Sequence, residues 1–415
     1  MLGLFAKSSL NGLASNRVFI YFISMKYLIA PTLLLLNLAA CVYEPEQFEE
    51  KAVESSASGA VSDIGTVHSI NNRMQICNPS ITQDTLNYPG SMLWLNFGGT
   101  LNVTADDSGF TTSGVAQHDR LTVTDSNNEV KWFLMMDSTE CQFQDPEWST
   151  HPNYLVSTSA DTTGSKGCSV LDYGIFAVRM SDHKRFWFVE KGLGEFTTPH
   201  VWVDPSVLEP DSAFSDSTLR GFFGTENVRL VFVDTTNSIV FVDYANGGMK
   251  KSVKLKKNAE MEKESWQMDS PMISPDGNFI VYNAIKGVSA MKSFVQKLSE
   301  GSVPIEIEQT SDMMGVPAQP HWFKYGERLF ITWAEVPNGN FFIKDDLSQS
   351  VTHDGSAGRT AMREIFLDAN APADLTMQWL GPVTEIAPIP TTGGRSPDGK
   401  FLATGYKLGF MLELP

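Results

Sequence analysis

Cysteine is scarce in this chain, with four residues among 415. So few cannot build a disulfide scaffold, and none follows the C-x-x-C or Cys/His spacing of a structural zinc site, so we predict no metal. Cys41 stands apart from the three later cysteines, Cys77, Cys141 and Cys168. Among these three we expect at most one disulfide, between Cys141 and Cys168, which flank one predicted strand pair. Three unpaired thiols are the open alternative.

Basic residues are also few, because Lys and Arg number 31 against 48 Asp and Glu and leave a formal net charge of -17. Such a charge repels phosphate backbones and argues against a nucleic-acid partner. The chain lacks a G-x-S-x-G hydrolase elbow and a Gly-rich strand-to-helix phosphate loop. The stretch DGSAG at 354–358 resembles the elbow only superficially and is expected to be a loop. We predict no cofactor and assign no catalytic residue.

The start of the chain has the pattern of a secretion signal. Met25 and Lys26 precede the apolar run YLIAPTLLLLNL, and small residues then lead to Cys41. A charged start, a short apolar run and small residues before the cleavage point are typical of such signals. Lys26 and Pro31 break up the stretch and leave it short of the ~20 apolar residues that a membrane span needs. The sequence predicts a signal peptide over residues 1–40, with Met25 as an alternative start.

Residues 38–41, LAAC, resemble the lipobox of bacterial lipoproteins. The resemblance implies cleavage before Cys41, lipid on its thiol, and further acylation that makes attachment to the membrane effectively permanent. The residue after the cysteine is Val42 and not an Asp. By the same resemblance, this implies that the lipoprotein is sorted to the outer membrane of the cell envelope. Residues 41–63 are acidic and rich in Ser and Ala, so we expect a flexible tether there.

Two nearly identical segments reveal an internal repeat. Residues 274–282, SPDGNFIVY, and residues 396–404, SPDGKFLAT, both join an SPDG turn to an apolar strand. In such a turn Pro presets the first position, Asp bonds its own backbone and Gly accepts positive φ. The repeat therefore predicts a tight connection between two strands.

Degenerate copies extend this repeat along the chain. They open with a proline, at Pro146, Pro199, Pro271, Pro320 and Pro388, at intervals of 49 to 72 residues. Each interval holds about four strands, and hairpins such as VRLVFVDTTNSIVFVDY alternate as antiparallel pairs do. Several four-stranded sheets in one chain pack most economically around an axis.

The sequence therefore predicts an all-β fold, a β-propeller of about six four-stranded blades over residues 64–415, with five or seven blades left open. Residues 66–137 provide one blade without the SPDG pattern. The chain ends about one strand short of a complete last blade. We expect an N-terminal strand near residues 66–70 to complete it.

The pattern of a Pro, a Trp and SPDG before a strand resembles the TolB-type propeller repeats, over roughly residues 145–415. Two copies are close and three are degenerate; the 388 copy, for example, has Arg395 in place of Trp. The resemblance implies a propeller fold and docking to partner proteins of the cell envelope.

Candidate site residues occupy the position after each repeat proline, namely Glu147, His200, Met272 and His321. The innermost strands of a propeller line its central channel, so these four side chains could face a common ligand-binding funnel. Positions that pack the blades are the alternative. A second feature is the lysine-rich run at 250–257, which suits an outer edge strand protected from pairing or a basic stripe for an acidic partner or glycan.

These features favour a lipid-anchored envelope propeller that binds a protein or polymer without chemistry of its own. Its partners would be the membrane, through the lipid on Cys41, and an envelope protein or glycan. The alternative is a glycoside-hydrolase-like enzyme acting on glycans. That function needs two acids ~5–9 Å apart in the funnel, for which Asp145, Glu147 and Asp269 are candidates.

Overall fold

The computed structural model of the protein describes residues 60–62, 65–106, 109–161, 173–207, 209–245, 251–286, 290–336, 358–368, 377–404 and 409–415. The predicted signal peptide, Cys41 with its lipid, the tether up to residue 59 and Cys168 lie outside these residues. None of the helices in the described ranges has the length and apolar character to cross a bilayer.

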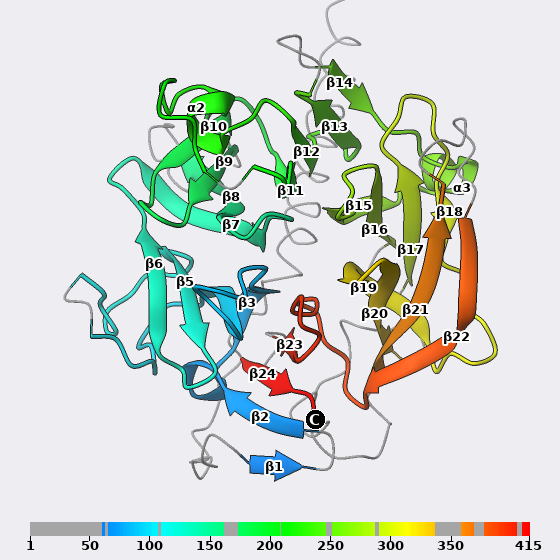
Figure 1. Cartoon of the computed structure of the whole chain (residues 1–415), viewed down its shortest axis with the longest axis horizontal. Helices are drawn as coiled ribbons and strands as arrows, with labels where there is room; N and C mark the ends of the chain where they lie inside the picture. Colours follow the sequence, from blue (N-terminus) through cyan, green and yellow to red (C-terminus); the bar gives the residue numbers. More distant parts are fainter. Residues whose placement is uncertain are drawn as a thin grey trace, which may run out of the picture. The chain divides into compact units, whose positions relative to one another are not determined.

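Six four-stranded antiparallel sheets form the blades of a β-propeller (Figure 1), which confirms the predicted fold class. The first five blades each use consecutive strands: β3 (Ile76–Ile81), β4 (Ser91–Asn96), β5 (Arg120–Asp125) and β6 (Val130–Met135); β7 (Glu140–Trp148), β8 (Tyr154–Asp161), β9 (Tyr173–Arg179) and β10 (Arg185–Val189); β11 (Thr197–Val203), β12 (Val228–Val233), β13 (Ile239–Asp243) and β14 (Lys251–Lys254); β15 (Gln267–Ile273), β16 (Phe279–Lys286), β17 (Ala290–Lys297) and β18 (Ile305–Glu306); β19 (Val316–Tyr325), β20 (Arg328–Val336), β21 (Arg359–Leu367) and β22 (Met377–Ala387). The first strand of each of these blades lies innermost (Figure 1).

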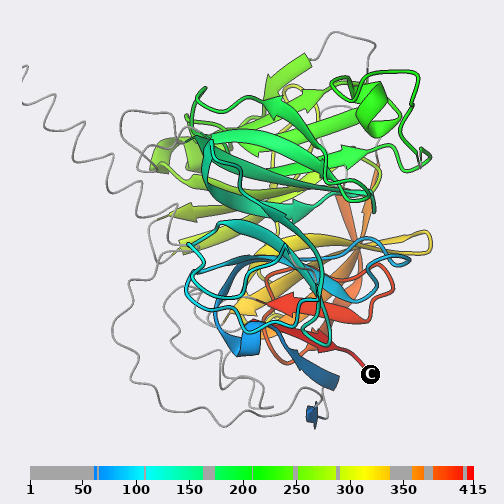
Figure 2. The same cartoon turned by 90° about the vertical axis from the view of Figure 1, so that its left-hand side faces the viewer.

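The sixth blade is built from both ends of the described chain. Its sheet order is β1 (Ala60–Ser62), β2 (Gly65–Ser69), β24 (Phe410–Glu413) and β23 (Phe401–Thr404). The register pairs Val67 with Leu412, and Figures 1 and 2 both place β2 beside β24. The expectation of an N-terminal closing strand is confirmed. β1 falls inside the predicted tether 41–63, so the end of that segment belongs to the sheet.

The three helices in the described residues are short: η1 (Asn71–Arg73), α2 (Leu219–Phe223) and α3 (Ala259–Glu264). The strands dominate because apolar residues alternate with polar ones at period two, or run continuously where both sheet faces are covered. The β12–β13 hairpin turns at Asn237, whose φ is 56°, as the polar turn sequence predicts.

The hydrophobic core lies between neighbouring blades. One cluster joins blades three and four through Trp202, Phe241 and Tyr282, and another joins blades four and five through Met272 and Trp333. Burial of such side chains stabilises the fold by roughly 1.5–3 kcal/mol each. The blades therefore hold one another through their faces, as wedges around a common axis.

The SPDG turn after β15 also joins two blades. Within the turn, Gly277 N donates to Ser274 O at 2.8 Å, and Phe279 N donates to Ser274 Oγ at 3.0 Å. From blade three, Trp202 Nε1 donates to Pro275 O at 2.9 Å. A Cβ on Gly277 would lie 2.7 Å from the Trp202 ring. Glycine is therefore required at position 277 for two reasons: its φ is 75°, and the Trp202 indole leaves no room for a Cβ atom.

Candidate functional site

Each of the five inner strands β3, β7, β11, β15 and β19 carries a β-bulge directly before a proline. This proline is Pro79 in β3 and a repeat proline in the other four strands. The register breaks between Cys77 and Ser80 in β3, for example, and at the equivalent place in the other four. The residue at each bulge has positive φ: Asn78 45°, Asp145 48°, Thr198 46°, Ser270 48° and Gln319 49°. Positive φ is uncommon in residues other than glycine, so its recurrence at five equivalent positions is a regular feature of the inner strands.

The five bulge residues are all polar and all half-buried, although the prolines that follow them are buried. A bulge redirects the side chain at the point where it interrupts the ladder. Because the inner strands surround the axis, the bulges place a layer of polar groups around it (Figure 1). Backbone strain of this kind often marks a functional site, but here it also serves the contacts between blades.

Asp145 links three consecutive blades at this layer. Asn78 Nδ2, from blade one, donates to its Oδ1 at 2.9 Å, and Thr198 N, from blade three, donates to its Oδ2 at 2.9 Å. Burial raises the pKa of Asp145, while these two hydrogen bonds lower it by a smaller amount. Both carboxylate oxygens are thus used within the fold.

Glu147, one of the four predicted funnel residues, lies in the adjacent layer after the proline. Its carboxyl group accepts a hydrogen bond from the Ser80 hydroxyl of blade one. The same hydroxyl oxygen accepts from Trp148 N at 2.9 Å. Burial raises the pKa of Glu147 to about 8, against the lowering effect of these hydrogen bonds. The group is therefore mostly protonated at neutral pH.

His200 and His321 occupy the position equivalent to Glu147, as the sequence predicts, since each is the first residue paired after its bulge. Ile273 N of blade four donates to His200 Nδ1 at 3.1 Å, so this nitrogen is unprotonated. Burial lowers the pKa of His200 to about 3, and the nearby His321 lowers it further. His321 Nδ1 donates to Gln319 O at 2.9 Å, and burial lowers its pKa too.

Met272 completes the predicted set and is buried, with 8% of its surface exposed. Its backbone oxygen accepts a hydrogen bond from Trp322 Nε1 of blade five at 2.9 Å. The equivalence of Glu147, His200, Met272 and His321 is thus confirmed by register. The contacts of Glu147, His200 and Met272 join blades, whereas His321 bonds within its own strand. A ligand-binding role for the four residues stays a prediction.

Asp269 brings a third acid to the axis. It directly precedes the bulge at Ser270, and hydrogen bonds link it to the side chains of Ser270 and Gln319. Burial raises its pKa to about 6, and the carboxylate of Asp145 contributes to the rise. Burial thus raises the pKa of all three acids, Asp145, Glu147 and Asp269. No set of three or more His, Cys, Asp or Glu close enough to hold a metal ion occurs in the described residues.

The bulge layer was not among the expectations from sequence, although a polar residue precedes each of the prolines Pro79, Pro146, Pro199, Pro271 and Pro320. Cys141 lies half-buried on β7. Its disulfide with Cys168 stays a prediction, because Cys168 lies outside the described residues.

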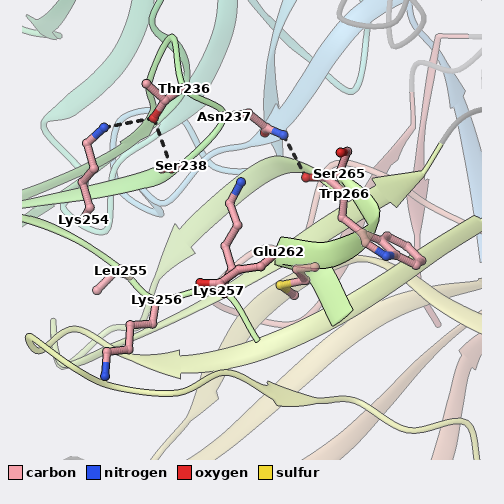
Figure 3. A pocket seen from close by; sticks show the side chains of 11 residues that line it. Thr236, Asn237, Ser238, Lys254, Leu255, Lys256, Lys257, Glu262, Ser265 and Trp266 are labelled. Atoms are coloured by element: carbon pink, nitrogen blue, oxygen red, sulfur yellow. Dashed lines mark hydrogen bonds between the residues drawn. The ribbon is translucent and has the colours of Figure 1, made fainter. Parts of the chain in front are cut away.

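A second candidate site is a surface pocket of about 460 Å³ at the outer part of blade three. Its wall includes Lys254, Lys256 and Lys257, the end of the predicted lysine-rich run (Figure 3). β14 is the last strand of its sheet and pairs with β13, which confirms the edge-strand interpretation for residues 251–254. The lysines thus protect an edge and also line a cavity.

The geometry defines the class of this protein as a six-bladed β-propeller whose inner strands carry a layer of polar bulge residues. No family model and no curated protein matches the chain. Solved structures with a similar fold include the Cps50 (Swd1) β-propeller domain of Myceliophteria thermophila, at 10% identity and a TM-score of 0.38 over 85% of this chain and 89% of that one.

Two further solved structures are similar to the chain over most of its length. A putative TolB from Agrobacterium tumefaciens is 11% identical with a TM-score of 0.39, over 82% of this chain and 91% of that one. A thermostable family-43 glycoside hydrolase is 12% identical with a TM-score of 0.40, over 80% and 99%. These similarities concern the fold alone.

Proposed function

We propose that the protein is a lipid-anchored module of the cell envelope that binds a partner protein and performs no chemistry of its own. The observation that carries this proposal is the position of its exposed aromatic side chains. Phe214, Tyr325 and Phe366 are 44%, 62% and 52% exposed, on blades three and five. Aromatic residues exposed on loops are the residue type that dominates binding energy at protein interfaces.

These three side chains lie at one end of the propeller. In a four-stranded meander the connections between strands one and two and between strands three and four share one end. Phe214 lies in the connection between β11 and β12, and Tyr325 ends β19 just before the turn to β20. Phe366 lies near the end of β21, next to the connection to β22. Leu86, 88% exposed, adds an aliphatic side chain of blade one to the same end. We call these four residues the apolar rim.

The hydrogen bonds of the channel acids support a binding role over catalysis. Asp145 has both oxygens engaged, and Glu147 is held by Ser80. Groups that already satisfy one another across blade boundaries stabilise the ring.

A pull-down from detergent-solubilised envelopes tests the proposal, with the lipidated protein as bait. We expect one stoichiometric partner protein, lost at least about tenfold in the double variant Tyr325→Ser and Phe366→Ser, since each exposed aromatic anchor contributes about 1–2 kcal/mol. The control is Leu193→Ser, because Leu193 is 70% exposed but belongs to the β10–β11 connection at the opposite end. Equal capture by both variants would contradict the rim as the binding surface.

The lipid anchor is tested separately. Mass spectrometry should find the mature chain beginning at an acylated Cys41, and Cys41→Ala should release the protein from the membrane fraction. A mature N-terminus at any other residue would overturn the anchor while leaving the rim untouched.

Glycan cleavage is the second candidate, and one observation favours it. Glu147 keeps its proton at neutral pH, with a pKa of about 8, while Asp269 has a pKa of about 6. Acids whose pKa values are set apart are the usual pairing of general acid and base. Release of reducing sugar from an envelope glycan, abolished in Glu147→Gln and Asp269→Asn, would establish this function in place of the first.

A further inference from the structure

The outermost strand of blade five differs from the outermost strands of the other blades. β22 spans 11 residues, whereas β6, β10, β14, β18 and β1 span 6, 5, 4, 2 and 3 residues. It pairs with β21 on one side and with no second strand in the described ranges, and Figure 1 places it at the periphery of the ring. Its other edge therefore presents backbone N–H and C=O groups to which a further strand can pair.

The longer outermost strands of the other blades carry basic side chains. Lys131 lies on β6, Arg185 on β10 and Lys254 on β14. Charged side chains on an edge strand oppose pairing with another chain. The first charged residue of β22 is Glu385, so residues 377–380, MQWL, lack this protection.

The second half of the β22 edge is closed by other side chains. The pairing with β21 shifts after Leu380, and residues 381–383 lie outside the regular ladder. Val383 N donates to Asp312 Oδ2 at 3.1 Å, and Gly381 O accepts from Arg363 Nε at 2.8 Å. These contacts occupy backbone groups that an added strand would need. The available part of the edge is therefore the stretch at 377–380.

One face of this stretch packs into the core. Met377 and Trp379 belong to the cluster between blades four and five, and the Trp379 ring lies 6.2 Å from that of Trp333, centroid to centroid. The Arg363 guanidinium covers the Trp379 ring at 5.3 Å from its centroid. Packing thus fixes the backbone of β22 beside its free edge, and an added strand meets a preorganised partner.

The other face of the stretch is apolar and exposed. Phe366 pairs with Gln378, and Glu364 pairs with Leu380, so these four side chains share one face of the sheet. Phe366, Gln378 and Leu380 are exposed, Leu380 to 37%. Phe366 also belongs to the apolar rim. The free edge of β22 therefore continues the surface proposed for partner binding.

The chemistry of the edge defines what can occupy it. A row of backbone donors and acceptors is complemented by another extended backbone at about 4.8 Å. The net charge of -17 repels a second copy of this chain and acidic segments of other proteins. The exposed Leu380 favours an apolar neighbour on the added strand. The suitable occupant is an extended, apolar segment of another protein without net negative charge.

We propose that blade five accepts such a segment of the partner protein as a fifth strand, paired with the backbone of residues 377–380. The inference rests on the proposed binding function and adds the form in which the partner binds. Hydrogen bonds between the main chains supply affinity, and the side chains that alternate along the added strand supply selectivity through their contact with Leu380.

A phage-displayed library of random peptides probes the edge in the full-length protein. We expect enriched peptides with apolar residues at alternate positions, and at least about tenfold lower enrichment on Leu380→Lys, because an edge lysine opposes pairing. The control is Leu193→Lys, the same change at an exposed leucine of the β10–β11 connection, which should select as the parent protein does. Equal enrichment on both variants, or the absence of enriched peptides, would overturn the proposal.

Hydrogen exchange with one selected synthetic peptide tests the backbone pairing itself. Binding should slow the exchange of amides at 377–380 at least about tenfold, while the amides of β14, another outermost strand, keep their rates. This measurement uses the parent protein and is independent of how the Leu380 variant folds. Peptide binding without protection at 377–380 would show docking by side chains alone and overturn the added strand.

Two further outcomes separate the proposals. Protection at 377–380 that rises with the concentration of the protein alone would show that two copies pair with each other, against a partner segment. A partner captured in the pull-down that leaves these amides unprotected would overturn the added strand and leave the binding function standing. Failure of the pull-down, with the peptide still paired at β22, would count against the proposed function alone.

Discussion

The axis and the outer pocket both collect ionisable side chains, but they treat them differently. At the axis, Asp145, Glu147 and Asp269 all form hydrogen bonds with other residues of the fold. The hydrogen bonds of Asp145 and Glu147 cross from one blade to the next. In the pocket Lys256 and Lys257 point in opposite directions (Figure 3) and form no ion pair within the described residues. The difference shows that ionisable groups near the axis join neighbouring blades, whereas these edge lysines make no such link.

The largest expected effect is the pH dependence that the axis imposes on stability. The pKa of Glu147 rises from 4.5 in the unfolded chain to about 8 in the fold. The folded state keeps a proton that the unfolded state has lost, so this stabilisation is complete below about pH 4.5 and disappears as pH rises through about 8. The loss is on the order of 5 kcal/mol across that window.

Urea unfolding between pH 4.5 and 8.5 measures this effect. Glu147→Gln should flatten the decline, while Glu327→Gln, at an exposed site, should keep it. His200 has the opposite sign, because its pKa falls from 6.5 to about 3 and stability is lost as pH decreases through that range. An unchanged slope in Glu147→Gln would show that the axis does not hold this carboxyl group protonated.

A smaller effect is expected when the axis loses Asp145. Asp145→Ala removes the acceptor of Asn78 Nδ2 and of Thr198 N, and two unsatisfied donors should destabilise the fold by about 3 kcal/mol. Asp145→Asn, which keeps one acceptor oxygen, should lose about half as much. Lys257→Gln should change the free energy of unfolding by less than about 0.5 kcal/mol, as for other surface substitutions. Equal losses at Asp145 and Lys257 would remove the distinction between axis and edge.

The smallest effect separates contacts between blades from strain within a turn. Gly277→Ala adds a Cβ 2.7 Å from Trp202 at a φ of 75°, whereas Gly326 has a φ of 59° and nothing within 4 Å of the same atom. We expect Gly326→Ala to cost about 1 kcal/mol and Gly277→Ala about 2 kcal/mol. Equal melting temperatures for the two variants would show that the Trp202 contact contributes nothing.

The repeat proline and the SPDG turn could be predicted from sequence, because their effect on the backbone is local. Pro and Gly set the backbone at their own positions, so the two copies at 274–277 and 396–399 predict two turns without knowledge of their surroundings. The blade count and the closing strand followed, since the last blade lacked a strand and residues 66–70 had a strand pattern. The equivalence of His200 and His321 followed from the same alignment.

The pocket on blade three could not be predicted from local sequence patterns. Its lysines were noted as an edge strand, but its other wall comes from the β12–β13 turn and from Trp266, which no local pattern connects to them. The acids at the axis likewise come from different blades. Their proximity depends on how β7 and β15 are placed around the ring.

The sequence by itself determined the repeating four-stranded unit and the turns and limited the number of blades to between five and seven, because backbone preferences and alternation of apolar residues act over a few residues. Only the tertiary structure decided which polar groups meet at the axis and which lysines face a cavity. Burial and hydrogen bonding between blades set the pKa of Glu147 and His200, and both depend on neighbours that are distant in the chain.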